Sequence, residues 1–560
     1  MSLAGAGLSG LLSAQRALEV VGHNVANAST PGYSRQRVEL TTARPQSGVG
    51  AGQIGTGVKV AAIRRTVDQF LAGRVQGAES QLGTAETFAS GVGEFEEMWH
   101  QGGETIGASM TALANAAEEL AARPDDVVLR TQFIDQAQDL ARRVRGLAED
   151  TVQLRSDLGQ SVAVDLDEAN GLVQEVKALS LDIRSIEVSG QAPNDLIDRR
   201  QLAIRALSRL VGAEASENGS GGTVLRVGGR ILLSGQNAET LSATQDGNGI
   251  AVVRLGDEVV ELEGGQVLGV QQAQAAGLAA EGELDRLAQS VMQAVNRANA
   301  AGVPASGPYA LLQSAFPVVD HNGNGISTDG PLALSGLPFA PSATTLQVSV
   351  TDPGGVRTTT PIAFDPATGS LDDLAAALDT VPFLNVSTSS SGILSLGAAP
   401  GYGFDFADLS GGDPDPGGLL ASLGFGAVFK GHDAASMDVA LASPGDLALG
   451  WTASPGDGRN ATRIASALSD GSALLEGATP SGFLGGIISQ QGLVARRANS
   501  SLESSGATLD ALEDRIQSVS GVSLEEEVAD MLKFQQAFQA SARFLQVIND
   551  VSTTLLGIVN

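Results

Sequence analysis

Both ends of the chain carry apolar residues at alternating steps of three and four, and this pattern constrains the fold more than any other feature. One such line runs through residues 11–28 and another through residues 524–558. A spacing near 3.5 residues gathers apolar side chains on one side of a helix, as a seam for a second helix. Each seam could be the edge of a core, but its presence at both ends of a differently composed chain favours an interaction between helices.

The ends of these two helices can also be predicted. The first helix should stop within residues 27–32, because Asn27 tolerates a left-handed cap and Pro31-Gly32 fits a type II turn. Ser523 and Glu526 form a capping box that starts the last helix. The predicted seam residues are Leu11, Leu18, Val21 and Val25 in the first helix, and Leu524, Val528, Met531, Phe534, Phe538, Leu545, Ile548 and Leu555 in the last.

Charge differs between the two ends. The formal net charge of −29 argues against nucleic-acid binding, because a phosphate binder needs a basic surface. Residues 1–65 nevertheless contain seven basic and two acidic residues, whereas residues 521–560 contain two basic and five acidic ones. The ends could attract each other, or they could be solvated faces of opposite sign, since exposed ion pairs are individually weak.

Between the ends, the sequence predicts helices first and strands later. Heptad spacing from residue 140 to 158, less regular up to 186, fits one helix of about 45 residues or two stacked ones. Fifteen of the 20 prolines lie between Pro304 and Pro455, so helices cannot dominate there. The remaining predicted elements are helices at 195–210, 283–300 and 371–378, β hairpins within 223–270, and strands at 346–350, 358–364 and 386–396.

The predicted fold class is α+β. We expect an elongated multidomain protein, in which N- and C-terminal helices form an antiparallel, coiled-coil-like stalk and a central helical domain carries a β-rich insert. The predicted domains are a terminal helical polymerisation domain (1–40 and 520–560), a helical stalk domain (41–215 and 456–519), a β-hairpin region plus helix (216–300) and a β-rich outer domain (301–455).

No set of residues points to an enzyme or to a cofactor. The chain has no cysteine and four scattered histidines, which indicates neither a zinc site nor a catalytic triad. Residues 50–55 match the spacing of a dinucleotide fingerprint, but no βαβ unit surrounds them, so a flexible turn is the better interpretation. We therefore expect a non-enzymatic protein without a cofactor.

One segment matches the first half of a calcium loop. Asp320, Asn322, Asn324 and Gly325 have the required spacing, but Pro331 stands where the loop needs a bidentate glutamate. The segment is therefore either a weak calcium site or, as we prefer, a polar turn in the β-rich domain. No other metal site is predicted.

Two further expectations concern export. No uninterrupted apolar stretch is long enough to span a bilayer as a helix, so we expect no membrane contact of that kind. The segment from Met1 to Leu12 lacks the basic region of an ordinary secretory signal. If the protein is exported, we expect a route without a cleaved signal.

Several segments resemble a known family. Residues 22–36 (GHNVANASTPGYSRQ) resemble the N-terminal signature of bacterial flagellar axial proteins, the family of rod, hook and hook-associated proteins. Residues 54–58, 63–65 and 68–71 (IGTGV, IRR and DQFL) resemble its next segment, and residues 526–531 and 534–542 (EEVADM and FQQAFQASA) its C-terminal helix. Three internal segments are similar to the hook-associated protein 1 branch, the hook-filament junction proteins: PNDLIDRR at 193–200, VNRANAAG at 295–302 and GDGRNA at 456–461.

This resemblance implies a function and a set of partners. It implies a structural flagellar subunit that leaves the cell through the type III export apparatus with the help of an export chaperone. It also implies an extracellular junction ring made of copies of the chain, in contact with the hook protein and hook-associated protein 3. Within residues 22–36, the resemblance adds six residues to the predicted assembly set: Asn24, Asn27, Thr30, Pro31, Gly32 and Tyr33.

Two alternatives stay open at this point. The chain could be another axial protein of the hook or rod type. It could also be a secreted adhesin or calcium-binding surface protein that uses residues 301–455. The first would be needed for hook formation, and the second would bind a host surface or calcium.

Overall fold

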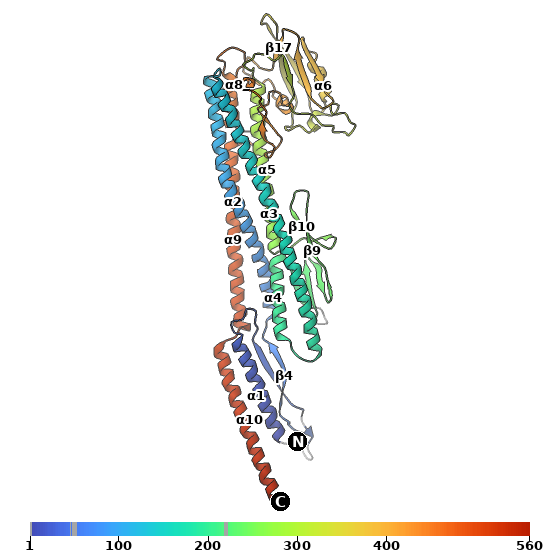
Figure 1. The fold of residues 1–560 in the computed structure, drawn as a ribbon, viewed down its shortest axis with the longest axis vertical. Helices are drawn as coiled ribbons and strands as arrows, with labels where there is room; N and C mark the ends of the chain where they lie inside the picture. The colour runs from blue at the N-terminus through green and yellow to red at the C-terminus, as the bar shows by residue number, and fades with distance from the viewer. Residues whose placement is uncertain (1–2, 45, 48–52, 218–221, 560) are drawn as a thin grey trace. The chain divides into compact units, whose positions relative to one another are not determined.

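The computed structural model describes residues 3–44, 46–47, 53–217 and 222–559 (Figure 1). The chain divides into two compact units, each built from separate stretches of sequence. The terminal unit comprises Met1–Gly91, Asp157–Gln274 and Arg496–Asn560, and the inner unit comprises Val92–Ser156 and Ala275–Ala495. This division differs from the predicted domains, because long helices contribute residues to both units. Those helices are α2 (Gln69–Ala122), α3 (Val127–Val188), α5 (Gln266–Ala300) and α9 (Pro480–Ser520).

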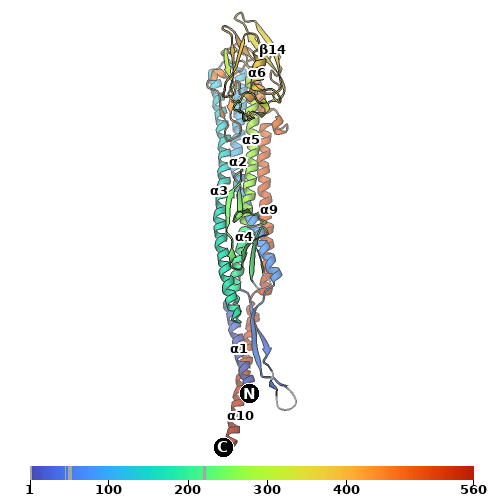
Figure 2. The same cartoon turned by 90° about the vertical axis from the view of Figure 1, so that its right-hand side faces the viewer.

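In the terminal unit, the first and last helices pair with each other. Helices α1 (Leu3–Ala26) and α10 (Leu524–Val559) lie side by side and antiparallel in both views (Figures 1 and 2). Helix α10 lies close to its predicted bounds, and α1 ends where predicted but begins at Leu3, before the predicted pattern starts at residue 11. At the end of α1, Gly32 has a φ of +75°, as the predicted turn requires.

A strand pair follows α1, within a region that the sequence prediction assigned mostly to a helical stalk. Strand β1 (Gln36–Thr42) pairs antiparallel with β4 (Val58–Arg65), and the short strands β2 (Gln46–Ser47) and β3 (Gln53–Ile54) pair between them. The β-branched residues of β1 and β4 suit a half-exposed strand pair better than a helix. Residues 50–52 of the glycine-rich stretch lie outside the described residues.

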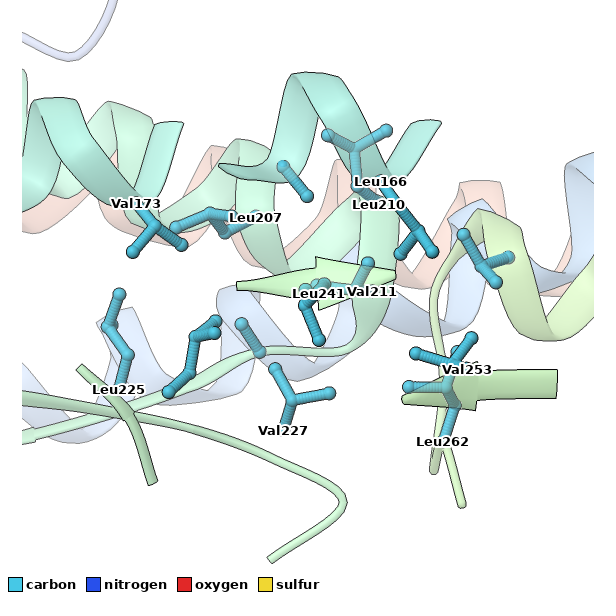
Figure 3. Close-up of a cluster of buried hydrophobic side chains, with 14 of the residues drawn as sticks. Leu166, Val173, Leu207, Leu210, Val211, Leu225, Val227, Leu241, Val253 and Leu262 are labelled. Atoms are coloured by element: carbon cyan, nitrogen blue, oxygen red, sulfur yellow. The ribbon is translucent and has the colours of Figure 1, made fainter. Parts of the chain in front are cut away.

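A second part of the terminal unit packs strands against helices. Helix α4 (Asn194–Val211) matches the predicted helix at 195–210, and α3 is one continuous helix rather than two stacked ones. Leu166 and Val173 of α3 and Leu207 of α4 face the sheets in one buried cluster (Figure 3). Both sheets are antiparallel. The first has the strand order β5 (Glu214–Glu217), β6 (Thr223–Val227), β7 (Arg230–Ser234), β8 (Asn237–Ala238). The second has the order β11 (Glu258–Val259), β10 (Ala251–Leu255), β9 (Leu241–Gln245). The hairpins expected in 223–270 end at β11, because α5 begins at Gln266 instead of residue 283.

The inner unit contains a helical core of large side chains and a β-rich region. Phe95, Trp99 and Phe133 are fully buried, and Gly277 of α5 leaves room for the Phe95 ring. The strands form antiparallel sheets in the orders β12 (Leu311–Gln313), β16 (Leu394–Ala398), β15 (Leu384–Thr388); β14 (Arg357–Phe364), β13 (Thr344–Thr351), β17 (Gly403–Asp405); and β18 (Phe429–Lys430), β19 (Asp438–Val439). The helices and 3-10 turns are α6 (Leu371–Leu378), α7 (Leu419–Leu423), α8 (Arg459–Ser469), η1 (Leu332–Leu334), η2 (Pro444–Asp446) and η3 (Ala473–Leu475).

One predicted strand of this region is wrong. Residues 386–396 form two strands, β15 and β16, instead of one. The chain turns between Ser389 and Gly392, where the Gly392 N–H donates to the Ser389 carbonyl and Gly392 has a φ of +76°. The other predicted strands and the helix at 371–378 are present, and the α+β class is confirmed.

Buried asparagines attach the β-rich region to helices α5 and α8. Asn296 donates to the Phe429 carbonyl and accepts from the Val428 and Phe429 N–H groups. Asn299 donates to the Gly426 carbonyl, and Asn460 donates to the Ala298 and Ala448 carbonyls. These residues come from the segments VNRANAAG and GDGRNA, which therefore hold loops in place through their amide groups.

Candidate assembly site at the paired chain ends

Near the start of α1, the seam between α1 and α10 is formed by glycines of α1. A Cβ atom added at Gly7 would lie 2.9 Å from Phe544 and 3.0 Å from Leu545, and one added at Gly10 would lie 3.0 Å from the Ser541 hydroxyl. The two glycines thus let the helices approach closely. Among the α10 residues, the predicted seam positions Met531, Phe534, Phe538, Leu545 and Ile548 are all half-buried.

On α1, the predicted seam is only partly right. Val21 and Ala14, which also falls on the predicted three-four spacing, are buried, Leu11 and Leu18 are half-buried, and Val25 is 41% exposed. The sequence prediction missed the residues that make up the rest of the buried side. They are Gly7, Ser13, Ala17 and Val20.

Large apolar side chains remain exposed on both helices. The predicted seam residues Leu524 and Val528 belong to this group, and the side chain of Leu555 lies outside the described residues. A contiguous exposed apolar patch marks an interaction site, whereas single exposed apolar residues are ordinary. The exposed large residues of this helix pair are the candidates for such a patch. The group, each member between 41% and 59% exposed, is Leu8, Leu12 and Val25 of α1 with Leu524, Val528, Leu532, Phe544, Val547 and Val551 of α10. Phe544 also borders the seam, because its ring edge lies beside Gly7. We call it the outer apolar face.

A buried polar contact joins α10 to α1 near the start of α10. Among the α10 side chains that the structure describes, Glu527 is buried, at 1% exposure, and the rest are at least partly exposed. Its carboxylate accepts from Asn24 Nδ2 at 3.0 Å and from Arg35 Nε at 2.6 Å. Neither Arg35 nor Glu527 was in the predicted assembly set, although both lie in segments that carry the family resemblance.

Asn24 uses its whole amide group. Its Nδ2 also donates to the Gln36 carbonyl at 2.9 Å, and its Oδ1 accepts from the Gln36 N–H at 3.0 Å and from the Tyr33 hydroxyl at 2.8 Å. Burial, followed by the negative charges of Asp195, Asp198 and Glu527, raises the pKa of Tyr33, so its hydroxyl stays a donor. The predicted assembly residue Asn24 thus connects α1, the following strand and α10.

The remaining predicted residues of this segment shape the turn. Asn27 donates to the His23 carbonyl and accepts from the Thr30 hydroxyl, and Pro31 is exposed. A Cβ atom added at Gly32 would lie 2.6 Å from Leu202, so this position needs a glycine for both conformation and space.

Opposite charges do meet at this site. Arg35 forms ion pairs with Glu526, Glu527 and Asp530, while the more distant contact between Arg37 and Glu526 is exposed on both sides. Burial lowers the pKa of the Arg35 guanidinium, but the hydrogen bonds and charges of Glu526 and Glu527 outweigh this effect, so the pKa lies above its usual value. The interpretation of attracting ends therefore holds for Arg35.

The segment PNDLIDRR anchors the strand pair that follows. Asp198 accepts from the Ser34 hydroxyl at 2.8 Å and from Arg65 at 2.6 Å. Asn194 donates to Gln36 Oε1 at 3.0 Å and to the Ile63 carbonyl at 3.2 Å. A cavity of about 860 Å³ lies beside these residues, between residues 31–34 and helices α2, α4 and α9.

The calcium-like loop at residues 320–329 forms hydrogen bonds among its own side chains and backbone groups. Asp320 accepts from the backbone N–H groups of Asn322, Gly323 and Gly325, and these bonds hold the pKa of its carboxyl below the usual range. Asn322 and Asn324 both donate to Asp329. Within the described residues, no group of three or more potential metal-ligating side chains is found, and no helix is long and apolar enough to cross a membrane.

Comparisons with protein families match three parts of the chain. A model described as the flagellar hook-associated protein FlgK helical domain matches residues 92–310. A model of the flagella basal body rod protein matches residues 6–33, and one of the flagellar basal body rod FlgEFG protein C-terminal matches residues 516–558. The last two matches include most of α1 with the turn after it, and most of α10 with the end of α9.

Curated relatives match along the full length. Flagellar hook-associated protein 1 of Bacillus subtilis (strain 168) is 25% identical over 556 residues, which cover 96% of this chain and 95% of the relative. The protein of that name from Escherichia coli (strain K12) is 23% identical, with 100% of both chains covered. The flagellar hook junction protein FlgK from Burkholderia pseudomallei has a similar fold, with a TM-score of 0.50 and 16% identity over 80% of this chain and 100% of that one. The resemblance predicted from the sequence is confirmed.

Proposed function

We propose that this chain, a relative of flagellar hook-associated protein 1 along its whole length, is a structural subunit of the bacterial flagellum that forms a junction ring between hook and filament. The observation that carries the proposal is the outer apolar face of the paired helices α1 and α10. Fully burying an exposed Val, Leu or Phe side chain contributes about 1.5–3 kcal/mol. Each residue of this face is already about half-buried and would contribute part of that amount, so covering all of them with neighbouring subunits would favour assembly.

The proposed role needs no catalytic step and no cofactor. Helices α1 and α10 bind each other through one side and offer the other side to neighbouring copies. The proposed partners are further copies of the chain, the hook protein on one side and hook-associated protein 3 on the other. Before assembly, a chaperone would cover the apolar residues of α10 and deliver the chain to the type III export apparatus, so that the protein acts outside the cell.

A deletion strain tests this proposal. Without the chain, we expect complete hooks that carry no filament, and filament subunits released into the medium. Cryo-electron microscopy of intact junctions from the parent strain should then show the chain between hook and filament. If the deletion strain lacked hooks, the chain would instead be a rod or hook protein, the alternative favoured by the two basal body rod matches at the chain ends.

A further inference from the structure

The apolar seam by itself defines the pairing of α1 and α10 only weakly. The contact advances along α1 from Gly10 to Asn24 by two heptads, and it recedes along α10 from Ser541 to Glu527 by the same amount. The helices therefore keep one register over this whole stretch. However, a slip by one heptad would exchange the apolar residues Met531, Phe538 and Leu545 for one another, and only beside Gly10 would an apolar residue replace Ser541.

The buried polar contact does not tolerate such a slip. Moving α10 by seven residues would bring Phe534 to the place of Glu527, and moving it by four would bring Met531. Neither residue carries a charge. A move by three residues would bring Asp530, but it would put the three-four spacing of the apolar seam out of step with α1. In the opposite direction, the same moves would need residues 520–523, which lie before α10 begins. Arg35, whose side chain is only 7% exposed, would then lose its buried carboxylate partner, and Asn24 would lose an acceptor.

We propose that Glu527, held by Asn24 and Arg35, selects the register in which α10 packs on α1. A single buried polar residue is known to select register in coiled coils, where the apolar seam provides affinity but little discrimination. The register decides which α10 residues face α1 and which belong to the outer apolar face. That consequence for assembly rests on the proposed function, whereas the register itself does not.

Because the chain has no cysteine, disulfides can report the register directly. A Cβ atom at Gly10 would lie 3.8 Å from Ser541 Cβ, the usual separation in a disulfide, so Gly10→Cys with Ser541→Cys reports the observed register. Gly10→Cys with Phe534→Cys or with Ile548→Cys reports a slip by one heptad in either direction, because one heptad spans roughly 10 Å of helix. Each pair would be equilibrated in the purified full chain in a glutathione buffer, and the disulfide fraction measured.

We expect the Gly10→Cys/Ser541→Cys pair to dominate in the otherwise unchanged chain. Glu527→Met keeps the length and apolar contact of the side chain. It should lower the equilibrium constant for the Gly10→Cys/Ser541→Cys disulfide at least tenfold, and raise the disulfide fraction of one or both slipped pairs. Glu527→Gln should act in the same direction but less strongly. Glu525→Met is the matched control, since Glu525 lies exposed in the same turn, and it should change none of the pairs.

Two results would overturn the proposal. One is an unchanged Gly10→Cys/Ser541→Cys pair in Glu527→Met. The other is a loss of that pair without a gain in either slipped pair, because Glu527 would then hold α10 without selecting its register. Neither result depends on whether the chain acts at the hook-filament junction, since the measurement uses the isolated chain.

Discussion

At the scale of single residues, Asn24 is the centre of the polar contacts in the assembly site, because it bonds to Tyr33, Gln36 and Glu527. Asn24→Ala would leave the Gln36 N–H and one oxygen of Glu527 without a partner in a buried place. A buried unsatisfied group costs about 1–3 kcal/mol. We therefore expect the Gln36 amide hydrogen to exchange with solvent roughly 30-fold faster, which corresponds to about 2 kcal/mol.

Hydrogen-exchange mass spectrometry on a peptide that covers residue 36 would measure this change. Asn27→Ala is a suitable control, because Asn27 lies at the same helix end and bonds only the turn. Equal exchange in Asn24→Ala and the unchanged chain would mean that Asn24 does not hold strand β1.

Asp457, from the segment GDGRNA, gives a prediction on acid sensitivity. Hydrogen bonds from Arg459 hold the pKa of the Asp457 carboxyl well below its usual range, against the effect of burial, and Thr452 adds a further bond. Since the folded pKa is lower than the unfolded value of about 3.9, the stabilisation is complete above that pH and is lost as the pH falls through the folded pKa. Asp457→Asn should remove this pH dependence.

The neighbouring ring makes the effect measurable. Arg459 stacks on Trp451, and the chain has two tryptophans, so 5-fluorotryptophan labelling gives two ¹⁹F signals. In the unchanged chain, we expect the Trp451 signal to move only well below pH 4. In Asp457→Asn it should differ already at neutral pH, while the signal of the buried Trp99 serves as an internal reference. An unchanged Trp451 signal in the variant would contradict this role of Asp457.

At the scale of elements, substitutions on the two sides of α10 should have different effects. Phe534 and Leu545 face the seam and are half-buried, so Phe534→Asp or Leu545→Asp would place a charge between the helices. We expect α10 to separate from α1, the inner unit to stay folded, and incorporation into the flagellum to be lost. Gln535→Asp, at an exposed position of the same helix, should have none of these effects. Normal filaments on the Phe534→Asp strain would disprove the role of the seam.

Val547 tests the outer apolar face separately. It is 59% exposed, so Val547→Asp should not disturb the pairing of α1 with α10, and the disulfide between Gly10→Cys and Ser541→Cys should still form. Contacts with neighbouring subunits should nevertheless be lost, because a buried unpaired carboxylate is strongly unfavourable. We expect a folded chain that cells export but do not retain at the hook. If this variant were incorporated normally, neighbouring subunits would not cover Val547.

At the scale of the whole molecule, the β-rich region has a core of its own. Its buried cluster includes Val348, Leu374 and Phe404, and draws its residues from positions 300–425. We therefore expect replacement of residues 308–425 by a short Gly-Ser linker to leave the disulfide between Gly10→Cys and Ser541→Cys intact. Filament attachment, scored by electron microscopy, should be affected less than by Phe534→Asp. If attachment stopped while the disulfide still formed, the adapter surface would lie in the β-rich region.

The predictions from the sequence succeeded where the pattern is local. The end of α1, the limits of α10 and the α10 seam from Met531 to Ile548 follow from spacing along one helix, and Pro31-Gly32 by itself defines a turn. The concentration of prolines identified the β-rich region for the same reason. Where two elements had to be separated, as at Ser389–Gly392, alternation of residue types was not enough.

Only the tertiary structure showed which polar residues are buried. In the sequence, Arg35 and Glu527 look like solvated charges, and they lie far apart, near opposite ends of the chain. Likewise, the buried side of α1 includes Ala17 and Val20, because strands β1 and β4 as well as α10 pack on that helix. The sequence alone determined that both ends form amphipathic helices, since periodicity is a property of one segment. Which residues they bury, and in which register, depends on segments that meet only after folding.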